Sequence, residues 1–123
     1  MLGYNYPLSH TLNDMHLKIM KELTTAEFQE KIANNRSLMV IEFWNGESGN
    51  CAIMEPIYSK LAETYKGKFD FFRLHVNHDF DRRNTFNISR LPSYTIYNRN
   101  HLMEIIQGVV SNTKFSQTLS AYI

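Results

Sequence analysis

The stretch Phe43-Trp-Asn-Gly-Glu-Ser-Gly-Asn-Cys-Ala-Ile-Met-Glu-Pro-Ile57 decides how we expect this chain to fold. Just before it, residues 38–41 read Leu-Met-Val-Ile, an apolar run typical of a strand that is buried on both faces. Gly46 and Gly49 mark a loop, and from Cys51 onward apolar residues recur at helical spacing along one side. The stretch therefore predicts a central strand, a short loop and an amphipathic helix.

Further strands and helices extend this pattern in both directions. Thr24 and Glu27 have the spacing of a capping box, which predicts the start of a helix. The predicted strands are 17–23, 37–44, 69–76, 93–97 and 102–110, and the predicted helices are 24–35, 51–66, 79–86 and 111–122. This order indicates one α/β domain over residues 17–123. Residues 1–16 are polar and aperiodic, and we expect them to form an N-terminal extension outside the domain.

The composition excludes several classes of function. A net charge of +1 over 123 residues supplies no strong field for nucleic acid or for a membrane surface. No apolar run approaches the ~18 residues of a membrane span. The first residues lack the basic start and long apolar run of a signal peptide. We therefore expect a cytoplasmic protein that binds neither nucleic acid nor membrane.

The sequence gives no support for a metal or a cofactor. Cys51 is the only cysteine, which excludes an internal disulfide and a cysteine-based zinc site. His75 and His78 lie three residues apart at the end of a predicted strand, where two such side chains point to opposite faces of the sheet. We expect no bound metal and no cofactor.

The opening stretch resembles the active-site segment of the thioredoxin family, Phe-Trp-Ala-x-Trp-Cys-Gly-Pro-Cys, then any four residues and a proline. Five residues match that pattern position by position: Phe43, Trp44, Gly49, Cys51 and Pro56. Further along, Leu91-Pro92 resembles the family's loop with a cis-proline, and Gly108 falls where the family packs a glycine beside that loop. The resemblance implies a thioredoxin fold, with a central mixed sheet flanked by helices on both faces.

Two charged residues strengthen the resemblance. Glu42 occupies the place of the family's buried acid, and Arg73 falls where the family keeps a lysine near that acid. In the family these groups help to move a proton to and from the second thiol. A buried carboxylate is costly without a partner, so we expect Glu42 to pair with Arg73. Because arginine does not give up its proton at ordinary pH, a purely structural pair is an equally good interpretation.

The departures from the family concern the chemistry itself. Ser48 stands where the family has its attacking cysteine, and a hydroxyl forms no stable bond to sulfur. Glu47 replaces a tryptophan, Asn50 a proline and Ala52 a residue that is often basic. These accompanying changes favour a serine that is natural at position 48 over one that was introduced by mutation. We expect Ser48 to cap the helix that follows, and we expect dithiol–disulfide exchange to be absent or very weak.

The family binds substrates in extended form against the residue before the cis-proline, which requires no cysteine. Our leading hypothesis is a redox-defective protein- or peptide-binding module related to cell redox homeostasis. The residues that the resemblance assigns to its groove are Trp44, Glu47, Gly49, Leu91, Pro92 and Gly108. A second hypothesis makes Cys51 the working thiol of a monothiol protein, which requires an exposed thiol. A scaffold or homo-oligomer subunit without a groove function is a third, with no support in the sequence.

Overall fold

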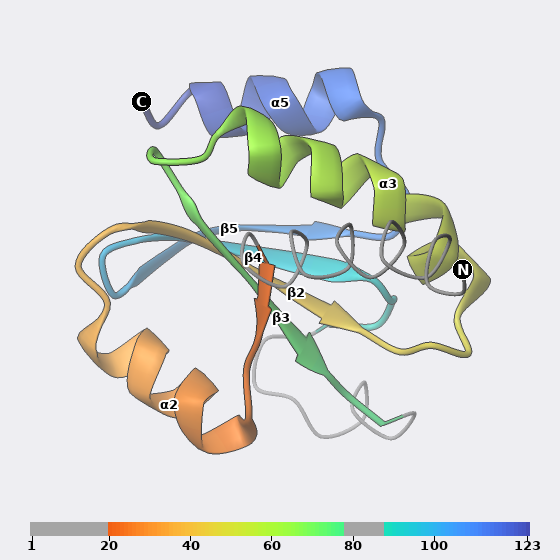
Figure 1. The fold of residues 1–123 in the computed structure, drawn as a ribbon, viewed down its shortest axis with the longest axis horizontal. Helices are drawn as coiled ribbons and strands as arrows, with labels where there is room; N and C mark the ends of the chain where they lie inside the picture. The colour runs from red at the N-terminus through yellow and green to blue at the C-terminus, as the bar shows by residue number, and fades with distance from the viewer. Residues whose placement is uncertain (1–19, 78–87) are drawn as a thin grey trace, which may run out of the picture.

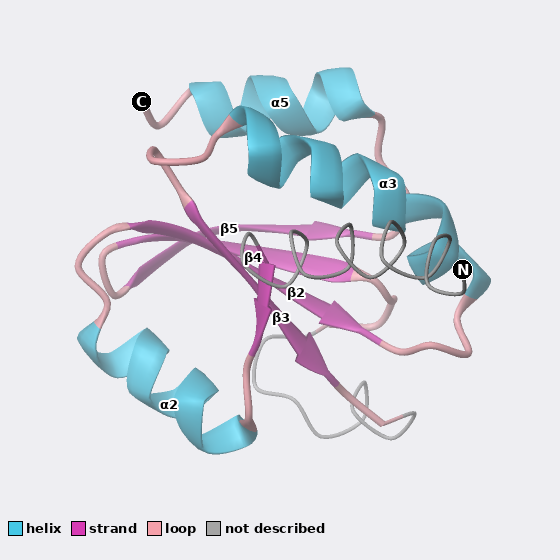
Figure 2. Ribbon diagram, viewed as in Figure 1, coloured by secondary structure: helices cyan, strands magenta, loops and turns pink. Residues whose placement is uncertain are grey.

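The computed structural model describes residues 20–77 and 88–123, which form a five-stranded sheet with helices on both faces (Figures 1 and 2). The strands are β1 (Met20–Glu22), β2 (Leu38–Trp44), β3 (Asp70–His75), β4 (Ser93–Asn98) and β5 (His101–Gln107). The helices are α2 (Thr25–Asn34), α3 (Gly49–Thr64) and α5 (Asn112–Ser120). In this architecture, the expected α/β fold with a mixed sheet flanked on both faces is confirmed.

Strand β2 lies at the centre of the sheet, whose order is β1-β3-β2-β4-β5. It pairs in parallel with β3 and antiparallel with β4, and its residues from 39 to 43 are buried. Burial on both faces explains why this strand reads as an uninterrupted apolar run. The register places Glu42 opposite Arg73 of β3 on one side and opposite Tyr94 of β4 on the other.

Two apolar clusters cover the two faces of the sheet. In Figure 1, α3 and α5 lie on one face and α2 lies on the other. Tyr58 of α3 and Phe115 of α5 belong to the first cluster, and Phe28 of α2 belongs to the second. The Tyr58 hydroxyl donates to the carbonyl oxygen of Phe72 at 2.8 Å, so this buried polar group is satisfied. None of the helices in the described residues is long and apolar enough to cross a membrane.

Within the described residues, each of the three helices is capped at its N-terminus by a serine or threonine hydroxyl. The Thr24 hydroxyl accepts from the backbone N–H of Glu27 while the Glu27 carboxylate accepts from the backbone N–H of Thr24, which is the predicted capping box. Ser48 caps α3 and Ser111 caps α5 in the same way, each through its side-chain oxygen. The predicted cap at Ser48 is therefore confirmed, and it fixes where α3 begins.

Some predicted boundaries lie outside the described residues: the start of the first strand at residue 17, the boundary at residues 16 and 17, and the predicted helix 79–86. Within the described residues, β1 spans Met20–Glu22. The predicted end of the last strand at residue 110 is corrected: β5 ends at Gln107 because Gly108 takes a φ of 81° that does not continue a strand.

Candidate functional site

The loop after β2 and the loop before β4 meet at the start of α3. The Ser48 hydroxyl accepts from the backbone N–H of Cys51 at 3.3 Å and lies 3.4 Å from the carbonyl oxygen of Leu91, to which it donates. The Leu91–Pro92 peptide bond is cis. The structure therefore brings Ser48, at the position of the family's attacking cysteine, beside Leu91 of the predicted groove, 43 residues away in the sequence.

The backbone around Pro92 is held by the last residue of β5 and the glycine after it. The N–H of Gly108 donates to the carbonyl oxygen of Pro92 at 2.8 Å. The side-chain oxygen of Gln107 accepts from the backbone N–H groups of Ser89 at 2.9 Å and Arg90 at 3.3 Å. The ladders of β4 with both neighbours begin only at Ser93. Leu91 thus lies two residues before β4, outside the hydrogen-bonded ladders of that strand. Its loop is held by Ser48 on one side and by Gln107 and Gly108 on the other.

Cys51 is buried, with an exposed fraction of 6%. It lies in the first turn of α3, directly behind the Ser48 cap. Glu47, in contrast, is exposed, and its backbone N–H donates to the side chain of Asn45. The surface at this point therefore presents a hydroxyl and a carboxylate, while the one thiol of the chain lies behind them.

Glu42 is the most deeply buried charged residue of the site, with an exposed fraction of 1%. One of its oxygens accepts from Nε of Arg73 at 2.8 Å, and the other accepts from the Tyr94 hydroxyl at 2.8 Å. A second nitrogen of Arg73 lies 3.1 Å from the carboxylate of Glu55. Both oxygens of the buried carboxylate are satisfied, as burial of a charge requires.

Burial and these contacts together raise the pKa values of Glu42, Tyr94 and Arg73. Burial raises the pKa of Glu42, and the attraction of Arg73 and the hydrogen bond from Tyr94 offset this only in part. Burial, followed by the negative charge of Glu42, raises the pKa of Tyr94, which keeps its proton and remains a donor. Although burial alone lowers the pKa of Arg73, the carboxylates around it raise the pKa overall, so Arg73 remains charged. Arg73 is therefore a fixed cation that can orient Glu42 but cannot exchange a proton with it.

Trp44 is held on three sides. The guanidinium carbon of Arg73 lies 4.2 Å from the centre of its ring, and the ring of His75 meets it edge-on at 4.9 Å between ring centres. The indole N–H donates to a carboxylate oxygen of Glu22 at 3.0 Å, and the other oxygen of Glu22 accepts from the backbone N–H of His75. The ring is thereby fixed in one orientation beside Arg73.

A hollow of about 250 Å³ opens between Trp44, Arg73 and the first turns of α3. Its lining residues are Trp44, Gly46, Ser48, Cys51, Ala52, Glu55 and Arg73. Ser48 is shared between this hollow and the contact with Leu91. The hollow therefore includes Trp44, one of the predicted groove residues, and adjoins the contact with Leu91 through Ser48.

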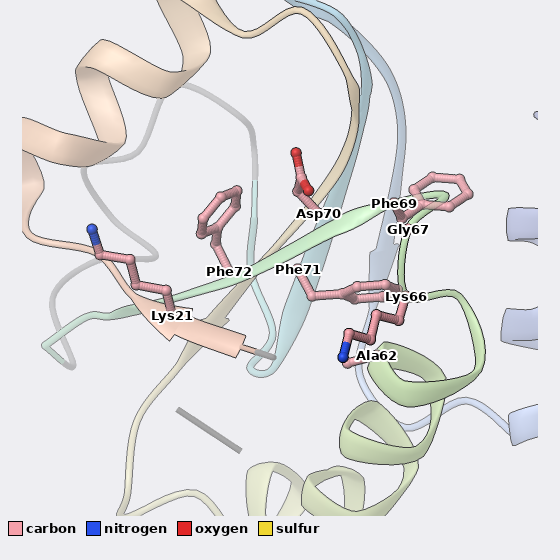
Figure 3. A pocket seen from close by; sticks show the side chains of 8 residues that line it. All are labelled: Lys21, Ala62, Lys66, Gly67, Phe69, Asp70, Phe71 and Phe72. Atoms are coloured by element: carbon pink, nitrogen blue, oxygen red, sulfur yellow. The ribbon is translucent and has the colours of Figure 1, made fainter. Parts of the chain in front are cut away.

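Another hollow, of about 200 Å³, lies at the opposite end of α3, and Figure 3 shows the eight side chains around it. They come from β1, from the end of α3, from the loop between α3 and β3 and from the start of β3: Lys21, Ala62, Lys66, Gly67, Phe69, Asp70, Phe71 and Phe72. It contains none of the residues that the sequence assigned to a site. Lys21 is already paired with Glu27 at 2.9 Å, so we do not place function there.

Sequence reasoning missed three residues of the site. Tyr94 faces Glu42 in the register of β2 with β4, and Glu22 faces Arg73 in the register of β1 with β3. Glu55 follows Cys51 by four residues on α3, a spacing that places both on one face of the helix and is visible in the sequence. Within residues 20–77 and 88–123, no three histidine, cysteine or acidic side chains are grouped as a metal site.

Comparison with known proteins identifies the family. The thioredoxin family model matches residues 19–121. The chain is similar to chloroplastic thioredoxin M4 of Arabidopsis thaliana, with 25% identity over 82% of this chain and 52% of that protein. It is also similar to a thioredoxin of Synechocystis sp., with 21% identity over 83% of this chain and 95% of that protein. The structure of Malassezia sympodialis thioredoxin shares the fold, with a TM-score of 0.69 and 17% identity over 83% of this chain and 89% of that one. The chain belongs to the thioredoxin family.

Proposed function

We propose that this chain is a thioredoxin-like binding module that grips an extended protein or peptide segment and does not catalyse dithiol–disulfide exchange. The observation that carries the proposal is the position of Leu91. Leu91 lies just before β4 and outside the ladders of that strand. Beside it lies Ser48, which stands where the family has a reactive thiol. A peptide placed there would extend the pairing of β4 by backbone hydrogen bonds, which need no sulfur.

The loss of exchange chemistry follows from the groups at the surface. The first step needs an accessible thiolate that attacks a disulfide, and a serine hydroxyl is no substitute. Ser48 instead accepts from the N–H of Cys51 and donates to Leu91, so its hydroxyl has a structural use. The Ser48 hydroxyl thus stabilises the loop and takes no part in disulfide exchange. We expect it to work in the cytoplasm.

The alternative function, a monothiol protein working through Cys51, depends on access to a thiol that is 6% exposed. We expect iodoacetamide to alkylate Cys51 of the native protein slowly, with a rate that follows the opening of the structure. Mass spectrometry at intervals, with the urea-unfolded protein as the reference, measures this. Fast alkylation of the native protein at neutral pH would support the monothiol function instead.

The binding proposal is tested with peptides that contain no cysteine. A library of random dodecapeptides displayed on phage is selected against the full chain, and the synthetic peptides are titrated by calorimetry. Leu91→Trp places a bulky ring at the proposed pairing site and is expected to weaken binding by about tenfold or more, which is about 1.4 kcal/mol.

Leu102→Trp is the matched control, because Leu102 is 42% exposed on β5 and outside the groove. Circular dichroism and thermal unfolding show whether each variant folds. Equal affinities of the wild-type protein and a folded Leu91→Trp variant would contradict the proposal. Selected peptides in which single backbone N–H groups are methylated provide a second test, since at least one such peptide is expected to lose binding.

A further inference from the structure

We propose that the hollow beside Trp44 is a subsite for a basic side chain, lysine or arginine, of the segment held in the groove. This inference rests on the proposed binding function, because Ser48 borders both the hollow and the contact with Leu91. A segment paired beside Leu91 therefore passes the mouth of the hollow.

Two of the residues that line the hollow are small. Ala52 has only a methyl group, and Gly46 contributes no side chain. A Cβ at Gly46 would lie 3.8 Å from the Trp44 ring, so any longer side chain there would extend into this space. The resulting volume of about 250 Å³ is several times the ~30 Å³ that one water occupies in the liquid. It is large enough for a side chain from another molecule.

The walls suit the stem of a long side chain. Trp44, Cys51 and Ala52 present an aromatic ring, a buried sulfur and a methyl group. The methylene groups of lysine or arginine remove such surface from water while the charged end remains polar.

The charges around the hollow favour a cation over an anion. Arg73 is the one cation among the lining residues, and it is 17% exposed and already paired with Glu42 and Glu55. Glu22 is also close enough to affect Arg73. Among the lining residues Glu55 and Arg73 balance each other, and Glu22, which does not line the hollow but accepts from the Trp44 indole N–H, adds one negative charge beside it. The N-terminus of α3 contributes about half a positive charge, which is less than one carboxylate.

Acceptors for the charged end are present on α3. Glu55 is 43% exposed and uses one of its oxygens for Arg73. A carboxylate accepts several hydrogen bonds, so Glu55 has capacity for a further donor. Pro56 has no N–H, so the carbonyl oxygen of Ala52 does not receive the usual helical bond from position 56. These groups give a lysine ammonium or an arginine guanidinium its partners.

The test uses a peptide whose binding depends on Leu91. Each position of that peptide is replaced in turn by lysine and by norleucine, which has a similar stem without the charge. We expect one position at which lysine binds about tenfold more tightly than norleucine. Glu55→Gln and Ala52→Leu should abolish that preference. Their controls, Glu63→Gln on the exposed side of α3 and Ala121→Leu after α5, should retain it.

The outcomes separate this inference from the binding proposal. Binding that depends on Leu91 but shows no preference for lysine at any position would overturn the subsite and leave the groove intact. If no peptide binds in a Leu91-dependent way, the full chain is titrated with Nα-acetyl-lysine N-methylamide and its norleucine analogue by NMR. A lysine-specific shift of the Trp44 indole N–H that Ala52→Leu removes would still support the subsite, and its absence would overturn it.

Discussion

Two polar groups of the molecule can be compared: a buried group of Glu42, Arg73 and Tyr94, and a surface group of Ser48 and Leu91. Glu42 and Ser48 are only six residues apart in the sequence, yet the two groups are held by different contacts. In the buried group, two side chains satisfy the carboxylate of Glu42 with two contacts of 2.8 Å. At the surface, one hydroxyl makes contacts of 3.3 and 3.4 Å to backbone groups. The comparison teaches that a buried carboxylate is held by short contacts from side chains, as burial of a charge requires, whereas a half-exposed hydroxyl makes longer contacts to the backbone.

The largest effect is expected from Arg73→Met. This variant removes the cation beside a carboxylate that is 1% exposed, and we expect it to lower the free energy of unfolding by about 3 kcal/mol at neutral pH. Urea denaturation measures the loss. Arg36→Met, on an exposed residue, should change stability by less than about 0.5 kcal/mol. Equal losses in the free energy of unfolding would contradict this expectation, because they would show that the buried pair stabilises the fold no more than an exposed arginine does.

Tyr94→Phe removes one of the two donors to Glu42. A hydrogen bond to a charged group contributes about 1.5–3 kcal/mol, so we expect a loss of about 2 kcal/mol. Tyr122→Phe is the matched control, because the Tyr122 hydroxyl donates to Glu104 at 2.9 Å in an exposed setting. We expect the control to cost less than about 0.5 kcal/mol. Similar losses in both variants, measured by chemical denaturation, would show that burial does not strengthen the contact to Glu42.

Ser48→Ala tests the surface group. Loss of a helix cap costs about 1 kcal/mol, and we expect this loss in thermal or chemical unfolding. Ser111→Ala removes the equivalent cap from α5 and should cost a similar amount. If Ser48→Ala has no effect while Ser111→Ala does, Ser48 has no structural role and a chemical one has to be sought.

The pH dependence of stability sharpens the account of Glu42. Burial raises the pKa of Glu42 above its ordinary 4.5, so the folded state holds this proton more tightly than the unfolded state. Stability from this group is therefore present below the ordinary value and is lost as pH rises through the folded-state pKa. Relative to Glu42→Gln, the wild-type protein should become less stable with rising pH. Urea denaturation of both proteins between about pH 4 and about pH 8 measures the difference, and a constant difference would contradict the raised pKa.

Local patterns in the sequence predicted much of the fold. The capping box at Thr24, the cap at Ser48 and the buried run of β2 depend on neighbours within a few residues, and the structure has all three. Strand β5 was predicted too long because Gly108 takes a positive φ that its neighbours do not signal.

The polar contacts of the site were less predictable. The position of Glu42 beside Arg73 was expected only through resemblance to the family. The contact of Tyr94 with Glu42 and that of Glu22 with Trp44 depend on strand register across 52 and 22 residues of sequence. Register is set by the packing of whole strands, so no local pattern announces these pairs. Only Glu55, one helical turn after Cys51, lay within reach of sequence reasoning.

The central claim, that the surface group has lost exchange chemistry while the fold remains, is tested most directly by the reduction of insulin disulfides with dithiothreitol. Wild-type protein is compared with Ser48→Cys and with a protein-free blank. We predict that the wild-type protein matches the blank and that Ser48→Cys accelerates the reaction, since the second thiol and its surroundings are in place. Wild-type protein that reduces insulin as fast as Ser48→Cys would contradict the account.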